Sequence, residues 1–166
     1  RMVILVGQPA SVKTTLVKKH LADYYHISTD NYIEQMMRRY KISYLDANKK
    51  YILDACTFIG KSMKHAFEHN LNLVIDQTNV SVESRAKKIR PMKYYNDRYE
   101  VVAVNFPITK EEQAIRLKQR LRDEKRDIPD DIIEKLWSEY EVPTTAEGFD
   151  WIVQAENFPS VNRGRR

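Results

Sequence analysis

The chain has 166 residues, of which 42% are hydrophobic and 31% are charged, a composition that excludes a disordered protein and suits one globular domain. Its one cysteine, Cys56, cannot form a disulfide within the chain. No apolar run is long enough to cross a membrane and no signal-peptide pattern is present, so we expect a cytoplasmic, reducing setting. The net charge of +5 arises mostly from arginines near the two ends and does not by itself predict a nucleic-acid partner.

Short aliphatic and β-branched runs alternate with helical patterns along the chain. Strands are expected at residues 2–6, 26–28, 71–76, 100–106 and 151–153. Helices are expected over residues 13–24, along an apolar stripe from Ile52 to Ala66, after a capping box at residues 109–112, and after Pro129. This alternation predicts an α/β fold, with a parallel sheet of about five strands and helices on both faces. We expect one domain over residues 1–158 and a disordered basic tail over residues 159–166.

The first strand is followed by a turn that matches most of the phosphate-binding P-loop pattern, G-x-x-x-x-G-K-[ST]. Gly7, Lys13 and Thr14 agree in identity and spacing. Backbone N–H groups at a helix N-terminus favour an anion, the lysine reaches the β- and γ-phosphates, and the threonine hydroxyl suits Mg²⁺. The alternative is a plain strand–turn–helix connection with a solvated lysine.

Val12 stands where the P-loop pattern has its second glycine. A branched Cβ beside the phosphates obstructs the approach of the backbone to a ligand. We therefore expect weaker nucleotide binding than a glycine variant would show.

Asp30 lies where the second expected strand ends and a helix begins. Ligands of open α/β sheets bind at the carboxyl ends of the strands, and a carboxylate there can take the proton of an attacking hydroxyl. The alternative is that Asp30 or Thr29 only caps the helix.

The third expected strand ends in Asp76, followed by Gln-Thr-Asn at residues 77–79. A carboxylate that closes a buried strand resembles a Walker B motif, in which it meets Mg²⁺ or its waters. For Thr78 and Asn79, a role in the turn alone is an alternative.

Residues 110–126 contain seven basic and four acidic side chains. One interpretation is a mobile lid whose arginines close over a triphosphate and stabilise transition-state charge. The other is a solvated helix face with i,i+4 ion pairs.

The order of these motifs resembles the P-loop kinases grouped around phage polynucleotide 5′-kinase, and the resemblance extends from about residue 2 to residue 153. It rests on residues 7–14, 28–30, 76–79, 84–85, the Arg-rich segment to Pro129, and residues 142–150. It covers the kinase domain only, because no motif of the phage enzyme's 3′-phosphatase domain is present. Besides Val12, one departure is Ile33, where the phage enzyme has an arginine that serves the acceptor; Arg38 or Arg39 could take that role.

The resemblance implies ATP and Mg²⁺ as cofactors and assigns residues to four roles. It implies that ATP is bound by Gly7, Pro9, Ala10, Ser11, Val12, Lys13, Thr14, Thr15, Arg120 and Arg122. It implies catalytic roles for Lys13, Asp30, Arg122 and Arg126, and a metal site at Thr14 and Asp76. It implies an acceptor site formed by Asp30, Arg38, Asp76, Thr78, Asn79 and Arg85.

The leading hypothesis is an ATP-dependent kinase that phosphorylates the 5′-hydroxyl end of DNA or RNA, as in nucleic-acid repair. Two alternatives stay open: a kinase of the same fold acting on a nucleoside or sugar, and a nucleotide-binding or non-catalytic interaction module that results from Val12. No membrane partner is expected, and the oligomeric state is not predicted.

Overall fold

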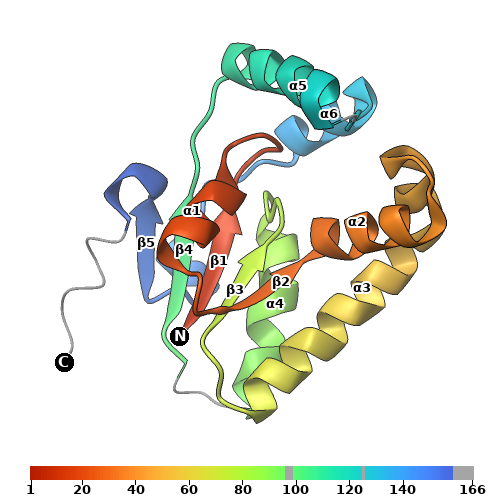
Figure 1. Cartoon of the computed structure of the whole chain (residues 1–166). Coiled ribbons are helices and arrows are strands. Elements are labelled where there is room, and N and C mark those ends of the chain that lie inside the picture. Colours follow the sequence, from red (N-terminus) through yellow and green to blue (C-terminus); the bar gives the residue numbers. More distant parts are fainter. Residues whose placement is uncertain (96–98, 125, 159–166) are drawn as a thin grey trace.

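The centre of the fold is a parallel five-stranded sheet with strand order β2-β3-β1-β4-β5 (Figure 1). The computed structural model describes residues 1–95, 99–124 and 126–158. The strands are β1 (Met2–Val6), β2 (Tyr25–Ser28), β3 (Leu73–Asp76), β4 (Val101–Asn105) and β5 (Trp151–Gln154). Within the described ranges, the predicted α/β class and the number of strands are confirmed, and the strand ends shift by one or two residues.

Helices cover both faces of the sheet, as predicted. They are α1 (Lys13–His20), α2 (Thr29–Tyr40), α3 (Tyr44–Glu68), α4 (Val82–Tyr95), α5 (Lys110–Glu124) and α6 (Asp130–Ser138), with 3₁₀ turns η1 (Thr145–Glu147) and η2 (Ala155–Asn157). Helix α1 is shorter than the predicted 13–24, because the chain turns at Leu21 and buries that side chain in the core.

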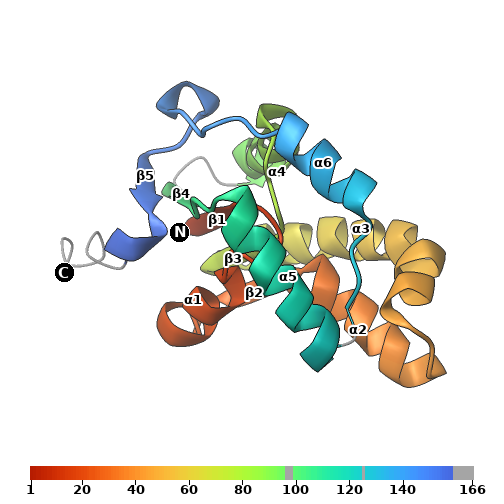
Figure 2. The same ribbon diagram turned by 90° about the horizontal axis from the view of Figure 1, so that it is seen from above.

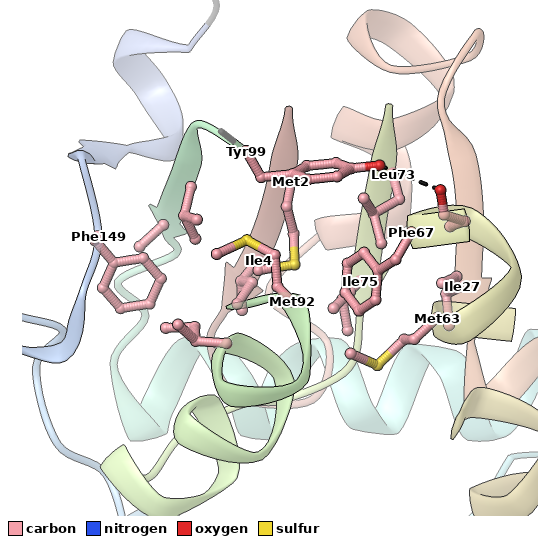
Figure 3. Close-up of a cluster of buried hydrophobic side chains, with 14 of the residues drawn as sticks. Met2, Ile4, Ile27, Met63, Phe67, Leu73, Ile75, Met92, Tyr99 and Phe149 are labelled. Atoms are coloured by element: carbon pink, nitrogen blue, oxygen red, sulfur yellow. Dashed lines mark hydrogen bonds between the residues drawn. The ribbon is translucent and has the colours of Figure 1, made fainter. Parts of the chain in front are cut away.

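The side chains of β1 alternate between two cores, because successive residues of a strand point to opposite faces. Met2 and Ile4 pack with Met63 and Phe67 of α3 and with residues of α4 (Figure 3). Val3 and Leu5 pack on the other face against α1. All five β1 side chains are buried, so the P-loop that follows starts from a rigid support.

Local capping agrees with the sequence pattern at the start of α5. The Thr109 N–H donates to the Glu112 carboxylate at 3.2 Å, and the Glu112 N–H donates to the Thr109 hydroxyl at 3.1 Å. This is the predicted capping box. Residues 110–124 of the segment predicted as an Arg-rich lid form α5, which lies with α6 above the carboxyl ends of the strands (Figures 1 and 2).

Two expectations about the chain as a whole have different outcomes. No helix of the described residues combines the length and the apolar character that crossing a bilayer requires. The predicted tail at 159–166 lies outside the described residues, so the domain boundary at 158 stays a prediction.

Candidate active site

A cleft of about 1070 Å³ opens at the carboxyl ends of the strands, between the P-loop, the α2–α3 pair and helices α5 and α6, which we call the lid helices after the predicted role of α5. Lys13 lines it from the P-loop, Asp30 from the start of α2, and Asp76 from the end of β3. These three groups are far apart in the sequence, and the parallel sheet brings them together because its carboxyl ends share one edge.

The P-loop passes very close to the end of β4. A Cβ on Gly7 would lie 2.8 Å from the Phe106 Cβ and 2.9 Å from the Ser11 hydroxyl oxygen, so only glycine fits there without displacement. Ala10 (φ 64°) and Val12 (φ 61°) both have left-handed backbone conformations. The loop therefore has the conformation that a second glycine would adopt most easily.

Val12 is the residue that immediately precedes α1; it is 54% exposed and lines the cleft. Left-handed backbone is strained for a β-branched residue. Val12 thus combines a left-handed backbone with a side chain that lines the cleft, and its obstruction of a bound nucleotide stays a prediction.

Lys13 points back into the P-loop. Its Nζ donates to the carbonyl oxygens of Gly7 (2.9 Å) and Gln8 (2.7 Å) and lies 3.2 Å from the Ser11 hydroxyl oxygen. Burial lowers the pKa of Lys13 to about 8, against the opposing attraction of Asp76 and of Asp30. A buried cation of this kind gains from an anion, because the negative charge offsets its lost hydration.

Thr14 and Asp76, the two residues predicted to hold a metal, are in contact in the cleft. The Thr14 hydroxyl donates to the Asp76 carboxylate at 3.1 Å, and the His26 Nε2 lies 3.2 Å from the same carboxylate oxygen. One hydroxyl and one carboxylate are oxygen donors of the type that Mg²⁺ takes beside phosphate and water, so the donor set fits that ion. The described residues contain no cluster of three or more acidic, histidine or cysteine ligands that would bind a metal without phosphate.

Sequence reasoning missed His26. In the β2–β3 pairing Ser28 is opposite Asp76, and His26 is on the same face of β2 because strand side chains alternate. A polar residue two positions before Ser28 is the signal that could have identified it.

Asp30 is oriented by Tyr44, the first residue of α3, whose hydroxyl donates to the Asp30 carboxylate at 2.8 Å. Burial and the charge of Asp30 raise the pKa of Tyr44, so this hydroxyl keeps its proton. The cap of α2 is Ser28, whose hydroxyl accepts from the Asn31 N–H at 3.4 Å. The capping role weighed for Asp30 or Thr29 is therefore filled by Ser28, and the Asp30 side chain is half exposed to the cleft.

The lid is attached to the P-loop by neutral and charged side chains. The Gln113 amide donates to the Pro9 carbonyl (3.2 Å), and Arg116 donates to the Ala10 carbonyl (3.2 Å). Trp137 of α6 donates to the Gln113 side chain at 2.7 Å, which joins the two lid helices. None of these three side chains was predicted as a site residue.

Arg126 crosses from the lid to α2. Its guanidinium lies 3.6 Å from the Asp30 carboxylate, also pairs with Glu34, and stacks over the Tyr44 ring at 5.3 Å. Arg120 lines the cleft as well and pairs with Glu124 at 3.3 Å. Both arginines thus line the cleft, and Arg126 contacts the carboxylate of Asp30.

Three predicted side chains do not line the cleft. Arg85 has no exposed side-chain surface, because both edges of its guanidinium are used by Glu147 (2.6 and 2.9 Å) and by backbone carbonyls. Asn79 is 2% exposed and donates to the Leu5 carbonyl at 2.8 Å. Arg122 is exposed but does not line the cleft, since Arg116 and Arg120 occupy the inward face of α5. The burial of Arg85 and Asn79 leaves neither side chain a surface for an acceptor, and the ATP-binding and catalytic roles of Arg122 stay predictions.

Gly7 is buried at the start of the P-loop and does not line the cleft, whereas the other predicted residues do line it. Arg38 does so from α2, where it pairs with Glu34 at 3.4 Å. Thr78 does so too, and its carbonyl accepts from the Gly7 N–H at 2.9 Å, which ties β3 to the P-loop. The remaining members are Pro9, Ala10, Ser11 and Thr15.

Known structures share this fold at low sequence identity. A protein of Chloroflexus aurantiacus described as a candidate kinase is 17% identical, with a TM-score of 0.71, covering 96% of this chain and 86% of that one. A structure from the PezAT toxin–antitoxin system of Streptococcus pneumoniae is 19% identical with a TM-score of 0.56, covering 81% and 56%. A fungal RNA kinase is 15% identical with a TM-score of 0.55, covering 99% and 90%. These likenesses establish a P-loop kinase-like fold.

The sequence also matches a family model, described as an AAA domain, over residues 2–143. That range contains the P-loop, Asp30, Asp76 and the lid. Because the match extends over most of the chain, this protein belongs to the AAA domain family.

Proposed function

We propose that this chain is an ATP-dependent kinase that transfers the γ-phosphoryl group of ATP to the 5′-hydroxyl end of a nucleic acid. The observation that carries the proposal is that Lys13 and Asp30 line the same cleft, with the Thr14–Asp76 pair also in it. A cation for phosphate at one end and a carboxylate for a hydroxyl at the other are the two groups that phosphoryl transfer requires.

The donor end binds the triphosphate through the P-loop and the lid. The backbone N–H groups of the first turn of α1 and the Lys13 ammonium attract the β- and γ-phosphates. Thr14 and Asp76 would hold Mg²⁺, which neutralises charge on the phosphate oxygens when it is bound. Arg120, which lines the cleft, adds positive charge beside the transferred group.

The acceptor end activates the hydroxyl. The Asp30 carboxylate accepts the hydroxyl proton as the oxygen attacks the γ-phosphorus, the bond to the β-phosphate oxygen breaks, and ADP leaves. The hydrogen bond from Tyr44 holds one carboxylate oxygen in place, which leaves the other for the acceptor. Arg126 lies against the same carboxylate. When the hydroxyl binds, Arg126 must either move away or contact the carboxylate together with the hydroxyl.

The choice of a nucleic-acid end is supported by the fold shared with a fungal RNA kinase and by Arg38, a cation on the acceptor side of the cleft. A small-molecule acceptor is the second candidate, because Glu34, Asp123 and Asp127 also line the cleft and repel a polyanion.

A labelled-phosphate assay tests the proposal. We expect transfer from ATP to 5′-OH DNA or RNA oligonucleotides and not to their 5′-phosphorylated forms. We expect Asp30→Asn to lower kcat by about 10²- to 10⁴-fold, the usual contribution of a general base, without loss of ATP binding. The KM for an oligonucleotide should also rise steeply with salt, whereas the KM for a neutral nucleoside should not.

Two other results of this assay would indicate a different function for the protein. Transfer to nucleosides or sugars alone would establish the small-molecule kinase. ATP binding without transfer to any hydroxyl, also in Val12→Gly, would show a binding module.

A further inference from the structure

A group of exposed cations, with one exposed and one half-buried aromatic ring, lies where α2 ends and α3 begins, beyond the acceptor end of the cleft. We call it the tip surface, and it consists of Arg39, Tyr40, Lys41, Lys49, Lys50 and Tyr51. The inference drawn from it rests on the proposed function and specifies the substrate further.

The two rings of the tip surface stack on each other. Tyr40 and Tyr51 have centroids 5.3 Å apart and planes inclined by 13°. Lys50 lies over both rings (5.8 and 5.3 Å), and Arg39 lies 5.5 Å from the Tyr40 centroid. Tyr40 is nevertheless 48% exposed, so a large aromatic surface faces solvent among cations.

The cations of the tip surface are not neutralised by the protein. Within residues 1–95, 99–124 and 126–158, no carboxylate forms an ion pair with Arg39, Lys41, Lys49 or Lys50. The neighbouring Arg38, by contrast, pairs with Glu34 at 3.4 Å. Unpaired cations around an exposed ring match the phosphates and bases of a single strand, because phosphates need positive charge and any base can stack.

The tip surface is continuous with the cleft. Arg38 and Asn48 line the cleft, and each is adjacent in sequence to a tip residue, Arg39 and Lys49 respectively. Ten residues of α2 separate Asp30 from Tyr40, which is about 15 Å at 1.5 Å per residue. This distance corresponds to about four or five stacked nucleotides at ~3.4 Å each.

We propose that the tip surface binds the single-stranded segment of the substrate that follows the 5′-hydroxyl nucleotide. The cations contact its phosphates, and a base four or five nucleotides from the reacting end stacks on Tyr40. The substrate class is therefore a polynucleotide with a single-stranded 5′ end, and a terminal mono- or dinucleotide is too short to use the whole site.

The experiment compares 5′-OH trimers with 5′-OH dodecamers of DNA and of RNA as acceptors. The tip variants are Tyr40→Ala and the double variant Arg39→Ala/Lys50→Ala. The matched controls are Tyr94→Ala, a ring that is 89% exposed on α4, and Lys93→Ala beside it. Fluorescence anisotropy with a 5′-phosphorylated dodecamer measures binding separately from the reaction.

We expect the wild-type KM to be lower for the dodecamer than for the trimer. Tyr40→Ala should raise the dodecamer KM about tenfold, within the range that loss of one base–aromatic stack produces, and leave the trimer kinetics unchanged. The double variant should reduce the salt dependence of dodecamer binding by about 1.4 in log–log slope, since each single-strand phosphate contact contributes about 0.7. If the tip variants weaken the use of one kind of dodecamer more than the other, that kind, DNA or RNA, is the preferred substrate.

Several outcomes overturn the inference and are distinguishable from failure of the proposed function. Equal effects of the tip and control variants would overturn it while leaving 5′-hydroxyl phosphorylation intact. Displacement of the dodecamer by polyglutamate at equal charge concentration would show an acidic-protein site instead. If no 5′-hydroxyl is phosphorylated, the proposed function fails, and anisotropy with the 5′-phosphorylated dodecamer still decides whether the tip surface binds a single strand.

Discussion

We predict that the protein is more stable with glycine than with alanine at position 12. At ordinary helical positions alanine gives the more stable protein. Val12 has φ 61° and ψ 25°, where a Cβ meets the neighbouring carbonyl at a cost of roughly 1–2 kcal/mol. Alanine at this position keeps that strain and loses most of the valine's buried methyl surface. Glycine removes the strain but adds about 0.4–1 kcal/mol of backbone entropy to the unfolded chain.

The two substitutions therefore separate backbone strain from lost packing. Because 54% of Val12 is exposed, either substitution loses about 1 kcal/mol of apolar burial or less. The net expectation is that Val12→Gly is more stable than Val12→Ala by about 0.5–1 kcal/mol, roughly 1–4 °C in Tm for a chain of this size.

Gly60 provides a matched control. It lies within α3, and a Cβ built on it meets nothing within 4 Å. There Gly60→Ala should raise the free energy of unfolding by roughly 0.5–1 kcal/mol, because glycine is unfavourable inside a helix.

Urea denaturation of the three variants, together with calorimetric titration of ATP, is the assay. We expect Val12→Gly to bind ATP more tightly than wild type, because the methyl groups leave the path of the phosphates. An alanine variant at position 12 that is as stable as the glycine variant would refute the strain argument, and unchanged ATP affinity in Val12→Gly would refute the obstruction argument.

Three further predictions concern Lys13, Gly7 and Arg85. The Lys13 pKa of about 8 lies below that of an ordinary lysine, and a bound phosphate raises this pKa. ATP binding at about pH 9 should therefore take up a proton that binding at about pH 7 does not. Calorimetry in buffers of different ionisation enthalpy measures this uptake, and equal uptake at both pH values would contradict the prediction. Gly7→Ala should displace the P-loop from Phe106 and lower stability by about 1–3 kcal/mol together with ATP affinity, whereas retention of both would show that the contact is tolerated. Arg85→Met should lower the free energy of unfolding by about 3–5 kcal/mol because it leaves the Glu147 carboxylate buried without its cation. Adding Glu147→Leu should recover only part of that loss in a denaturation experiment, because the backbone carbonyls that Arg85 contacts lose their donor in both variants.

Local features of the fold were predictable because their causes lie within a few residues. Continuous apolar runs identified the buried strands, and the Thr109–Glu112 pair identified the start of α5. The spacing from Gly7 to Thr14 identified the P-loop by the same local logic. Parallel topology then predicted that Asp30 and Asp76 would lie at one edge, since all strands end there.

The functional side chains that sequence reasoning misjudged depend on contacts across the chain. Arg85 and its partner Glu147 are 62 residues apart, and only tertiary packing makes that arginine a buried structural cation instead of a substrate ligand. Tyr44 reaches Asp30 only because α2 and α3 fold back on each other.

The left-handed conformation of Val12 was likewise not readable from its identity, because a β-branched residue disfavours that conformation and the surrounding P-loop imposes it. Residue order thus decides which elements form and which motifs follow them. Burial and long-range contacts decide which of the charged side chains remain available for chemistry.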